Sequence, residues 1–203
     1  MKILKFLLIV LFLVPYISFS QQNSKADVAN VSKITLLNPG LSYEMRIGRL
    51  QTLYGQFFIH TLFYSDTLNS VINLPSFYFD PAMTVQYRIY FNAKKREAHA
   101  KRIDMNSLNY VSAVSETIFS KAKYKKSSRD EKNRRLVNKF GVVCGLQRNY
   151  KRRFSLDINL GLGYLITTQT STSVYTGQSV KENIGMIAPL GQLNFGIWLN
   201  KKK

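Results

Sequence analysis

The chain has 203 residues, enough for a single domain with a core of its own, and its 29 Lys and Arg against 11 Asp and Glu give a formal net charge of +18. Its one cysteine, Cys144, excludes an intrachain disulfide. Stability must therefore come from backbone pairing and from burial of side chains.

The N-terminal segment has the layout of a secretory signal. Lys2 and Lys5 precede an apolar run, and the small residues Ser18 and Ser20 stand before Gln21. This order predicts a cleaved Sec-type signal peptide over 1–20 and a linker over 21–28, with a buried N-terminal helix as the alternative. No later stretch reaches the roughly eighteen apolar residues that a membrane-spanning helix requires. We therefore expect an exported chain that crosses no bilayer as a helix.

Apolar residues recur at every second position along most of the remaining chain. From Phe154 to Ile166 every even-numbered residue is apolar, and the odd-numbered ones are polar or glycine until Leu165. A period of two sorts side chains onto the two faces of a β-strand, whereas a helix would scatter them around its circumference. The pattern predicts eight strands, with the weakest alternation in the fifth, at residues 29–37, 40–48, 51–65, 77–92, 108–120, 136–148, 153–168 and 186–200.

The length of these runs distinguishes two kinds of barrel. Strands in soluble proteins usually have about five or six residues, whereas about nine to eleven are needed to cross a bilayer as a tilted strand. Aromatic residues also recur on one face at the spacing of two interfacial girdles, Phe154 with Tyr164 and Phe79 with Phe91. The pattern favours an eight-stranded antiparallel up-and-down transmembrane β-barrel over 29–200, followed by a basic tail at 201–203. A soluble periplasmic barrel that binds an apolar ligand has the same periodicity with its apolar face inward, and it is the alternative.

The connections fall into two groups if both termini lie in the periplasm. Those at 38–40, 66–76, 121–135 and 169–185 are then expected outside the cell, and those at 48–50, 93–107 and 149–152 in the periplasm. Long outer loops and short inner turns are usual for such barrels. The connection at 93–107 is unusually long, and we expect strands that protrude from the membrane to absorb part of it.

A polar face turned inward needs its charges paired. The bore of an eight-stranded barrel is just wide enough for side chains to fill it, and an isolated buried charge carries a large desolvation cost. Because the polar face carries both signs in similar number, we expect a ladder of ion pairs that plugs the lumen and leaves no wide pore. The predicted members of this lumen charge network are Glu44, Arg46, Asp80, Arg88, Glu116, Lys139, Arg153 and Asp157.

Several segments carry a family resemblance: "KITLLNPGLSYEMRIG", "YRIYFN" followed by a basic stretch and "NSLNYVSA", "GLQRNYKRRFSLDINLGLGY" and the closing "GQLNFGIWLN". Together they resemble the small outer-membrane β-barrel proteins of Bacteroidota, OmpA/OmpX-like eight-stranded barrels grouped under domain-of-unknown-function names. The resemblance covers most of the mature chain. It implies an outer-membrane location and recognition of the closing strand by the barrel-assembly machinery, and it implies no defined chemistry.

Few residues are candidates for catalysis or metal binding. A lipid-modifying enzyme of the same fold needs a nucleophile and a base within hydrogen-bond reach. The two histidines are His60, expected as a hydrogen-bonded lumen residue, and His99, in a basic turn. They and the one cysteine are too widely separated for a metal cluster, and the glycines at 161 and 163 follow no nucleotide-binding pattern. We predict no catalytic residue, cofactor or metal, with the lipid-modifying enzyme as the alternative function.

The segment at 121–135 concentrates positive charge. Exposed beside the outer leaflet, it would bridge lipopolysaccharide phosphates or capture an acidic surface polymer, since guanidinium groups bind phosphate bidentately; a solvated loop without a ligand is the alternative. The residues expected to contact lipopolysaccharide are Lys123, Lys125, Lys126, Arg129, Lys132, Arg134 and Arg135. We therefore expect a non-enzymatic barrel, a monomer by preference, with outer-membrane lipid and lipopolysaccharide as partners and no nucleic acid.

Overall fold

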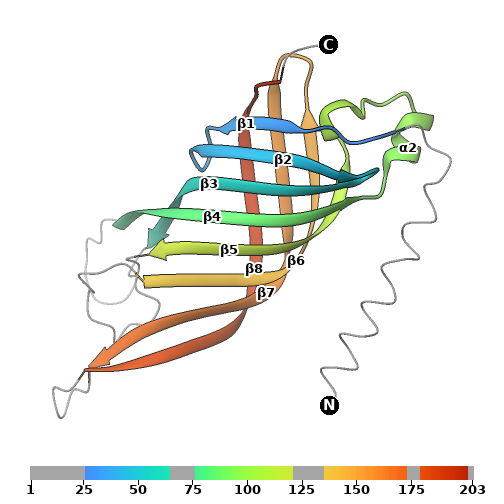
Figure 1. The fold of residues 1–203 in the computed structure, drawn as a ribbon. Helices are drawn as coiled ribbons and strands as arrows, with labels where there is room; N and C mark the ends of the chain where they lie inside the picture. The colour runs from blue at the N-terminus through green and yellow to red at the C-terminus, as the bar shows by residue number, and fades with distance from the viewer. Residues whose placement is uncertain (1–25, 65–75, 121–134, 173–178, 201–203) are drawn as a thin grey trace, which may run out of the picture.

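Eight antiparallel strands, each hydrogen-bonded to the next in sequence order, close into a barrel in the computed structural model, which describes residues 26–64, 76–120, 135–172 and 179–200 (Figure 1). Closure pairs the first strand with the last at residues 33–35 and 196–198, whereas the rest of β8 has a strand partner only in β7. The prediction of an all-β, eight-stranded antiparallel barrel is confirmed. The strands are β1 (Val31–Thr35), β2 (Gly40–Gly48), β3 (Gln51–Tyr64), β4 (Ser76–Tyr90), β5 (Asn109–Ser120), β6 (Arg135–Asn149), β7 (Phe154–Thr172) and β8 (Ser179–Trp198).

Alternation along the strands sends most polar side chains into the bore and most apolar ones outward, although a buried apolar cluster that includes Phe58, Ile118 and Val137 also lies inside. In β3, Thr52 is fully buried, whereas the outward Phe57 is 69% exposed. In β7, Asp157 is 2% exposed and Leu160 71%. A soluble barrel with an apolar ligand would turn these faces the other way. The predicted orientation of the two faces is therefore the observed one.

The ring closes between β1 and β8 through a short pairing, which we call the seam. Only three residue pairs form its ladder, Lys33 with Trp198, Ile34 with Ile197 and Thr35 with Gly196. Hydrogen bonds just beyond the strand ends extend it: the Leu199 amide donates to the Ser32 carbonyl at 2.8 Å, and Asn200 Nδ2 donates to the Asn30 carbonyl at 2.7 Å. By contrast, β7 and β8 pair continuously from Phe154 to Thr172.

The connection between β4 and β5 corrects one expectation. In place of protruding strands, it forms a short helix, α2 (Ala93–Ala98), and a 3₁₀ turn, η1 (Asp104–Asn106). These compact turns bury Ala93 and Leu108 together with Ala26, Val28 and Leu50 in one apolar cluster, which an extended hairpin could not cover. Within the described ranges, no helix has both the length and the hydropathy to span a membrane.

Candidate functional site

The bore contains a buried polar network centred on Arg88 of β4, whose side chain is fully buried. Its Nε donates to Gln86 Oε1 at 2.9 Å. One of its Nη groups donates to Gln147 Oε1 at 2.7 Å and to Asp157 Oδ2 at 2.8 Å. The registers between neighbouring strands from β4 to β7 thus bring Arg88, the Gln147 amide and the Asp157 carboxylate together. Charge-assisted bonds of this length are the strong kind, and they fix the guanidinium in the centre of the barrel.

Two tyrosine rings hold the same guanidinium from its faces. Arg88 Cζ lies 3.8 Å from the centroid of the Tyr54 ring and 4.3 Å from that of Tyr110. Tyr110 also donates its hydroxyl to Asp157 Oδ1 at 2.7 Å. A Cβ atom at Gly145 would overlap the Tyr110 ring, so the glycine makes room for the ring inside the bore. A planar guanidinium suits this slot, because it both stacks on rings and donates in its own plane.

Glu44 of β2 joins this network from the other side of the bore. Its Oε1 accepts hydrogen bonds from Thr52 Oγ1 at 2.8 Å and from the Tyr90 hydroxyl. Its Oε2 accepts from Gln147 Nε2 at 3.0 Å, so Gln147 links Glu44 to Arg88. We call Glu44, Arg88, Gln147, Asp157 and the three rings Tyr54, Tyr90 and Tyr110 the inner lumen network.

The charges at this level of the bore balance. Two cations, Lys33 and Arg88, and two carboxylates, Glu44 and Asp157, are each 3% exposed or less. Buried charges persist when they are paired and hydrogen-bonded, as Arg88, Asp157 and Glu44 are. Lys33 differs, because its buried Nζ has no hydrogen-bond partner among the described side chains and lies 6.0 Å from the centroid of the Tyr54 ring. The balance explains how a barrel with a strongly basic sequence can enclose ionised groups.

A second group of polar side chains lies farther along the bore, toward the end of the barrel at which β3 ends and β4 begins. Lys139 Nζ donates to Glu116 Oε1 at 2.7 Å, with the two side chains 19% and 16% exposed. Asp80, opposite His60 in the strand register, accepts a hydrogen bond from Ser120 Oγ at 2.7 Å. We call these five residues the outer lumen group.

Side chains fill the space between the two groups. A cavity of about 20 Å³ remains there, lined in part by Gln86, Glu116, Lys139 and Asn159. This volume has room for about one water molecule. The described bore is therefore packed at this level, with room for little more than water.

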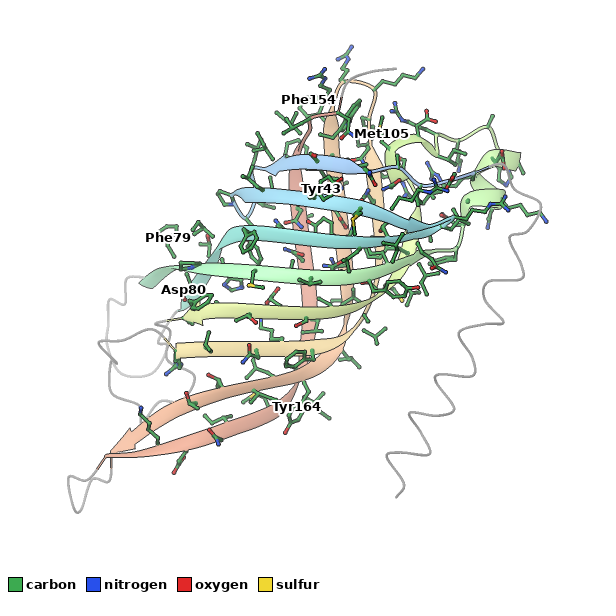
Figure 2. All side chains as sticks on the ribbon, viewed as in Figure 1. Tyr43, Phe79, Asp80, Met105, Phe154 and Tyr164 are labelled. Atoms are coloured by element: carbon green, nitrogen blue, oxygen red, sulfur yellow. The ribbon has the colours of Figure 1, made fainter. Side chains whose placement is uncertain are left out.

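The N-terminal segment and the β4–β5 connection close the other end of the bore, forming what we call the end cap. The Ala29 amide donates to Asn106 Oδ1 at 2.7 Å, and Asn106 Nδ2 donates back to the Ala29 carbonyl at 2.8 Å. Asn149 Nδ2 donates to the Met105 carbonyl, which attaches β6 to the same turn (Figure 2). Met105 and Asn106 both have positive φ, 53° and 61°, a conformation that these bonds hold in place.

Two predicted members of the lumen charge network lie outside the bore, which corrects the expectation. Arg46 is exposed and pairs with Asp27 at 2.6 Å, where a register shift before Gly48 ends the β2–β3 ladder. Arg153 has a φ of 70° in the turn before β7. Arg46 still pairs with Thr52, but it is the last residue of that ladder before the shift, and its long side chain leaves the bore to reach Asp27. Arg153 precedes the first residue of β7, so strand parity does not apply to it. The structure places the other six in the bore: Glu44, Asp80, Arg88, Glu116, Lys139 and Asp157.

The sequence prediction missed uncharged members of the network and one buried cation. These are Lys33, Tyr54, Gln86, Tyr90, Tyr110 and Gln147, each 3% exposed or less. All of them share the inward parity of their strands, and that parity is the signal that could have found them. The predicted network contains only charged side chains, so the tyrosine hydroxyls and glutamine amides on the same face are not among its members.

Arg135 corrects the prediction for the basic segment at 121–135. It is the first residue of β6, pairs with Ser120 and is 8% exposed, so it lies inside the rim and is not part of an exposed loop. The other residues predicted to contact lipopolysaccharide lie outside the described residues: Lys123, Lys125, Lys126, Arg129, Lys132 and Arg134.

The outside of the barrel is apolar on every strand. Phe79 and Phe91 of the β4 region and Phe154 and Tyr164 of β7 are 43–62% exposed, and Phe79 and Phe154 lie toward opposite ends of the barrel (Figure 2). A soluble monomer rarely exposes an apolar patch larger than a few hundred Å². One large exposed apolar residue from each strand in turn is Ile34, Met45, Phe57, Val85, Phe119, Val142, Leu160 and Ile187.

Candidates for chemistry are few in the described residues. No group of three His, Cys, Asp or Glu side chains within them is placed to hold a metal ion. The Ser120 hydroxyl, which is fully buried, donates to Asp80; this contact stabilises the carboxylate and does not present a nucleophile to solvent. His99 is exposed at the end of α2.

No protein-family model matches the chain, and no curated protein or solved structure is similar to it. Similarity therefore assigns neither a family nor an activity.

Proposed function

We propose that this protein is a non-enzymatic outer-membrane β-barrel with a plugged polar lumen and a structural or surface-interaction role. One observation carries the proposal: apolar side chains cover the outside of the closed ring while ionised groups are buried within it. Exposing apolar surface to water costs about 25 cal/mol per Å², whereas hydrocarbon removes that cost. Ladder pairing around the ring also satisfies the paired backbone groups where no water is present.

The contents of the bore support a structural role over transport. The inner lumen network links β2 to β7 by hydrogen bonds, and the end cap covers the bore beside it. A channel would need a continuous water-filled path, which these side chains occupy. In a structural role, the ring of strands holds the connecting segments in place at the two ends of the barrel.

The proposed location and partners come from the sequence. The predicted signal peptide at 1–20 supports export, and the resemblance to small Bacteroidota barrels supports assembly by the barrel-assembly machinery. Lipid of the outer membrane would surround the apolar face. The basic segment at 121–135 would contact lipopolysaccharide phosphates.

A pair of matched substitutions tests the membrane placement. Leu160→Arg places a charge between the two aromatic levels and is expected to destabilise a lipid-embedded barrel by about 2–4 kcal/mol. Leu199→Arg, just beyond the end of β8 and four residues past the Phe195 ring that stacks on Phe154, is expected to cost about 0–1 kcal/mol. Both leucines are already exposed, at 71% and 45%, so in a soluble barrel neither change has a packing cost. The measurement is urea unfolding of the barrel folded into vesicles.

Two further assays test the same proposal. The wild-type protein should stay with membranes during carbonate extraction and show heat-modifiable gel mobility. Release by carbonate, or equal costs for the two arginine variants, would contradict the membrane placement. Mass analysis of lipid A should give the same profile with and without the gene, and a changed profile would refute the non-enzymatic assignment.

A further inference from the structure

The end of the barrel that holds the end cap carries a ring of exposed cations. We call them the basic collar: Lys94, Lys95, Lys101, Lys151, Arg152 and Arg153. The first three lie on the β4–β5 connection and the others in the turn between β6 and β7, two segments that the antiparallel order of strands brings to one end (Figure 1).

The acids near this end do not neutralise the collar. Asp27 pairs with Arg46 at 2.6 Å, and Asp104 lies 3.9 Å from Arg102. In the part of the chain that the structure describes, none of the six collar side chains has a carboxylate within ion-pair distance. The acids on these two connections are Glu97 of α2 and Asp104, against eight Lys and Arg, so this end carries a net positive charge.

Aromatic residues set the level of the collar relative to the apolar face. Tyr150 and Phe154, 50% and 43% exposed, stand directly before and after the cations of the β6–β7 turn, and the Phe154 ring stacks on Phe195 with centroids 5.9 Å apart. Phe91, 44% exposed, stands three residues before Lys94. On both connections the cations thus begin where the outward aromatic rings end. At a membrane interface, aromatic rings lie at the edge of the apolar layer and Lys and Arg lie just beyond them, toward water.

We infer that the basic collar binds the phosphate groups of anionic phospholipids in the leaflet that surrounds this end of the barrel. The inference rests on the proposed membrane placement. The cations lie on the rim and not in a cleft, next to an apolar face that would contact the acyl chains of the same lipid. A nucleic acid or a soluble acidic protein would use the charges but not the apolar face beside them.

The size of the effect follows from the number of cations that one lipid meets. A Lys or Arg near an anionic surface contributes about 1 kcal/mol, which is about fivefold in affinity. A headgroup at the rim reaches one or two collar side chains. We expect a preference of about fivefold or more for phosphatidylglycerol over phosphatidylcholine, weakened by salt.

The experiment uses the full mature chain folded into phosphatidylcholine vesicles that contain phosphatidylglycerol with a photoactivatable headgroup, with a matched phosphatidylcholine probe in parallel. Cross-linked peptides are identified by mass spectrometry, which separates this end of the barrel from the other. Labelling is expected in the peptides spanning 91–109 and 148–154, about fivefold above the phosphatidylcholine probe.

Variants separate charge from structure. A glutamine variant should remove the preference for phosphatidylglycerol at this end; it combines Lys94→Gln, Lys95→Gln, Lys101→Gln, Lys151→Gln and Arg152→Gln. A charge-conserving variant, with arginine at the four lysine positions and Arg152→Lys, should keep the preference. Arg153 stays unchanged, because its backbone conformation and its carbonyl, which accepts from the Trp198 amide at 2.9 Å, hold the turn. Heat-modifiable mobility of each variant verifies that the ring is closed.

Two results would overturn the inference. Insertion into vesicles with equal labelling by both probes, or a preference that the glutamine variant keeps, removes the collar as a phospholipid site and leaves the membrane placement standing. A wild-type chain that does not insert removes both proposals together.

Discussion

Replacing Asp157 with alanine tests whether the inner lumen network holds the barrel together. The carboxylate accepts from Arg88 at 2.8 Å and from the Tyr110 hydroxyl at 2.7 Å. Without it, a fully buried guanidinium loses its ion-pair partner, and removing one partner of a buried pair typically costs about 3–5 kcal/mol. The Tyr110 hydroxyl also loses its acceptor, worth about 1 kcal/mol. We expect Asp157→Ala to lower the free energy of unfolding by about 4–6 kcal/mol.

A matched variant and a double variant make this prediction specific. Glu116→Ala removes an ion-pair partner whose Lys139 is 19% exposed, so the freed ammonium can reach water and the loss should be about 1 kcal/mol. The double variant Arg88→Met with Asp157→Leu removes both charges and leaves neither one buried without its partner. It should therefore cost much less than Asp157→Ala alone.

Urea unfolding of the barrel in vesicles measures these free energies. Trp198, the only tryptophan of the chain, reports by fluorescence, since it is 2% exposed in the native barrel at the seam. A loss below about 1 kcal/mol for Asp157→Ala, or a double variant as costly as the sum of its single changes, would refute the electrostatic reasoning.

Three further predictions concern packing, the end cap and the bore. Gly145→Ala should destabilise by about 1–3 kcal/mol because its Cβ overlaps the Tyr110 ring, whereas at Gly55 a Cβ meets no heavy atom within 4 Å and Gly55→Ala should be neutral or stabilising in the same unfolding assay. Asn106→Ala removes both hydrogen bonds to Ala29 and should make the β4–β5 connection sensitive to trypsin while the ring stays heat-modifiable; an intact connection at wild-type rates would contradict this. The wild-type barrel should show no steady conductance in a planar bilayer, and a stable open channel would refute the packed bore.

The sequence determines the strands better than it determines what lies between them. Most predicted strands match the observed bounds within two residues, because a period of two is a direct consequence of a two-faced sheet. β7 and β8 are the exceptions, since they continue to Thr172 and begin at Ser179, beyond the predicted 168 and 186. Their extra residues are largely polar on both faces, so the backbone ladder continues after the apolar signal has stopped.

The site was predictable in its charges and not in its partners. Inward parity is enough to place Glu44 and Arg88 in the bore, but which groups meet depends on the stagger between neighbouring strands. Arg88 of β4 reaches Asp157 of β7 only because three successive registers set their relative heights. The end cap was missed because Asn106 and Ala29 are separated by 77 positions and Asn106 lies between the predicted strands.

The seam also has a consequence for how the chain must fold. Ser32 and Asn200 are bonded at 3.0 Å across 168 positions, so the first strand has to find the last one after nearly the whole polypeptide has been made. Bringing such distant ends together is entropically costly, and here it is rewarded by only three ladder pairs. Because sequence-adjacent strands pair throughout the rest of the sheet, we expect the hairpins to assemble before the ring closes. A chain that ended before Gly196 would lack all three seam pairs and leave two unprotected edges, a form prone to joining with its own copies.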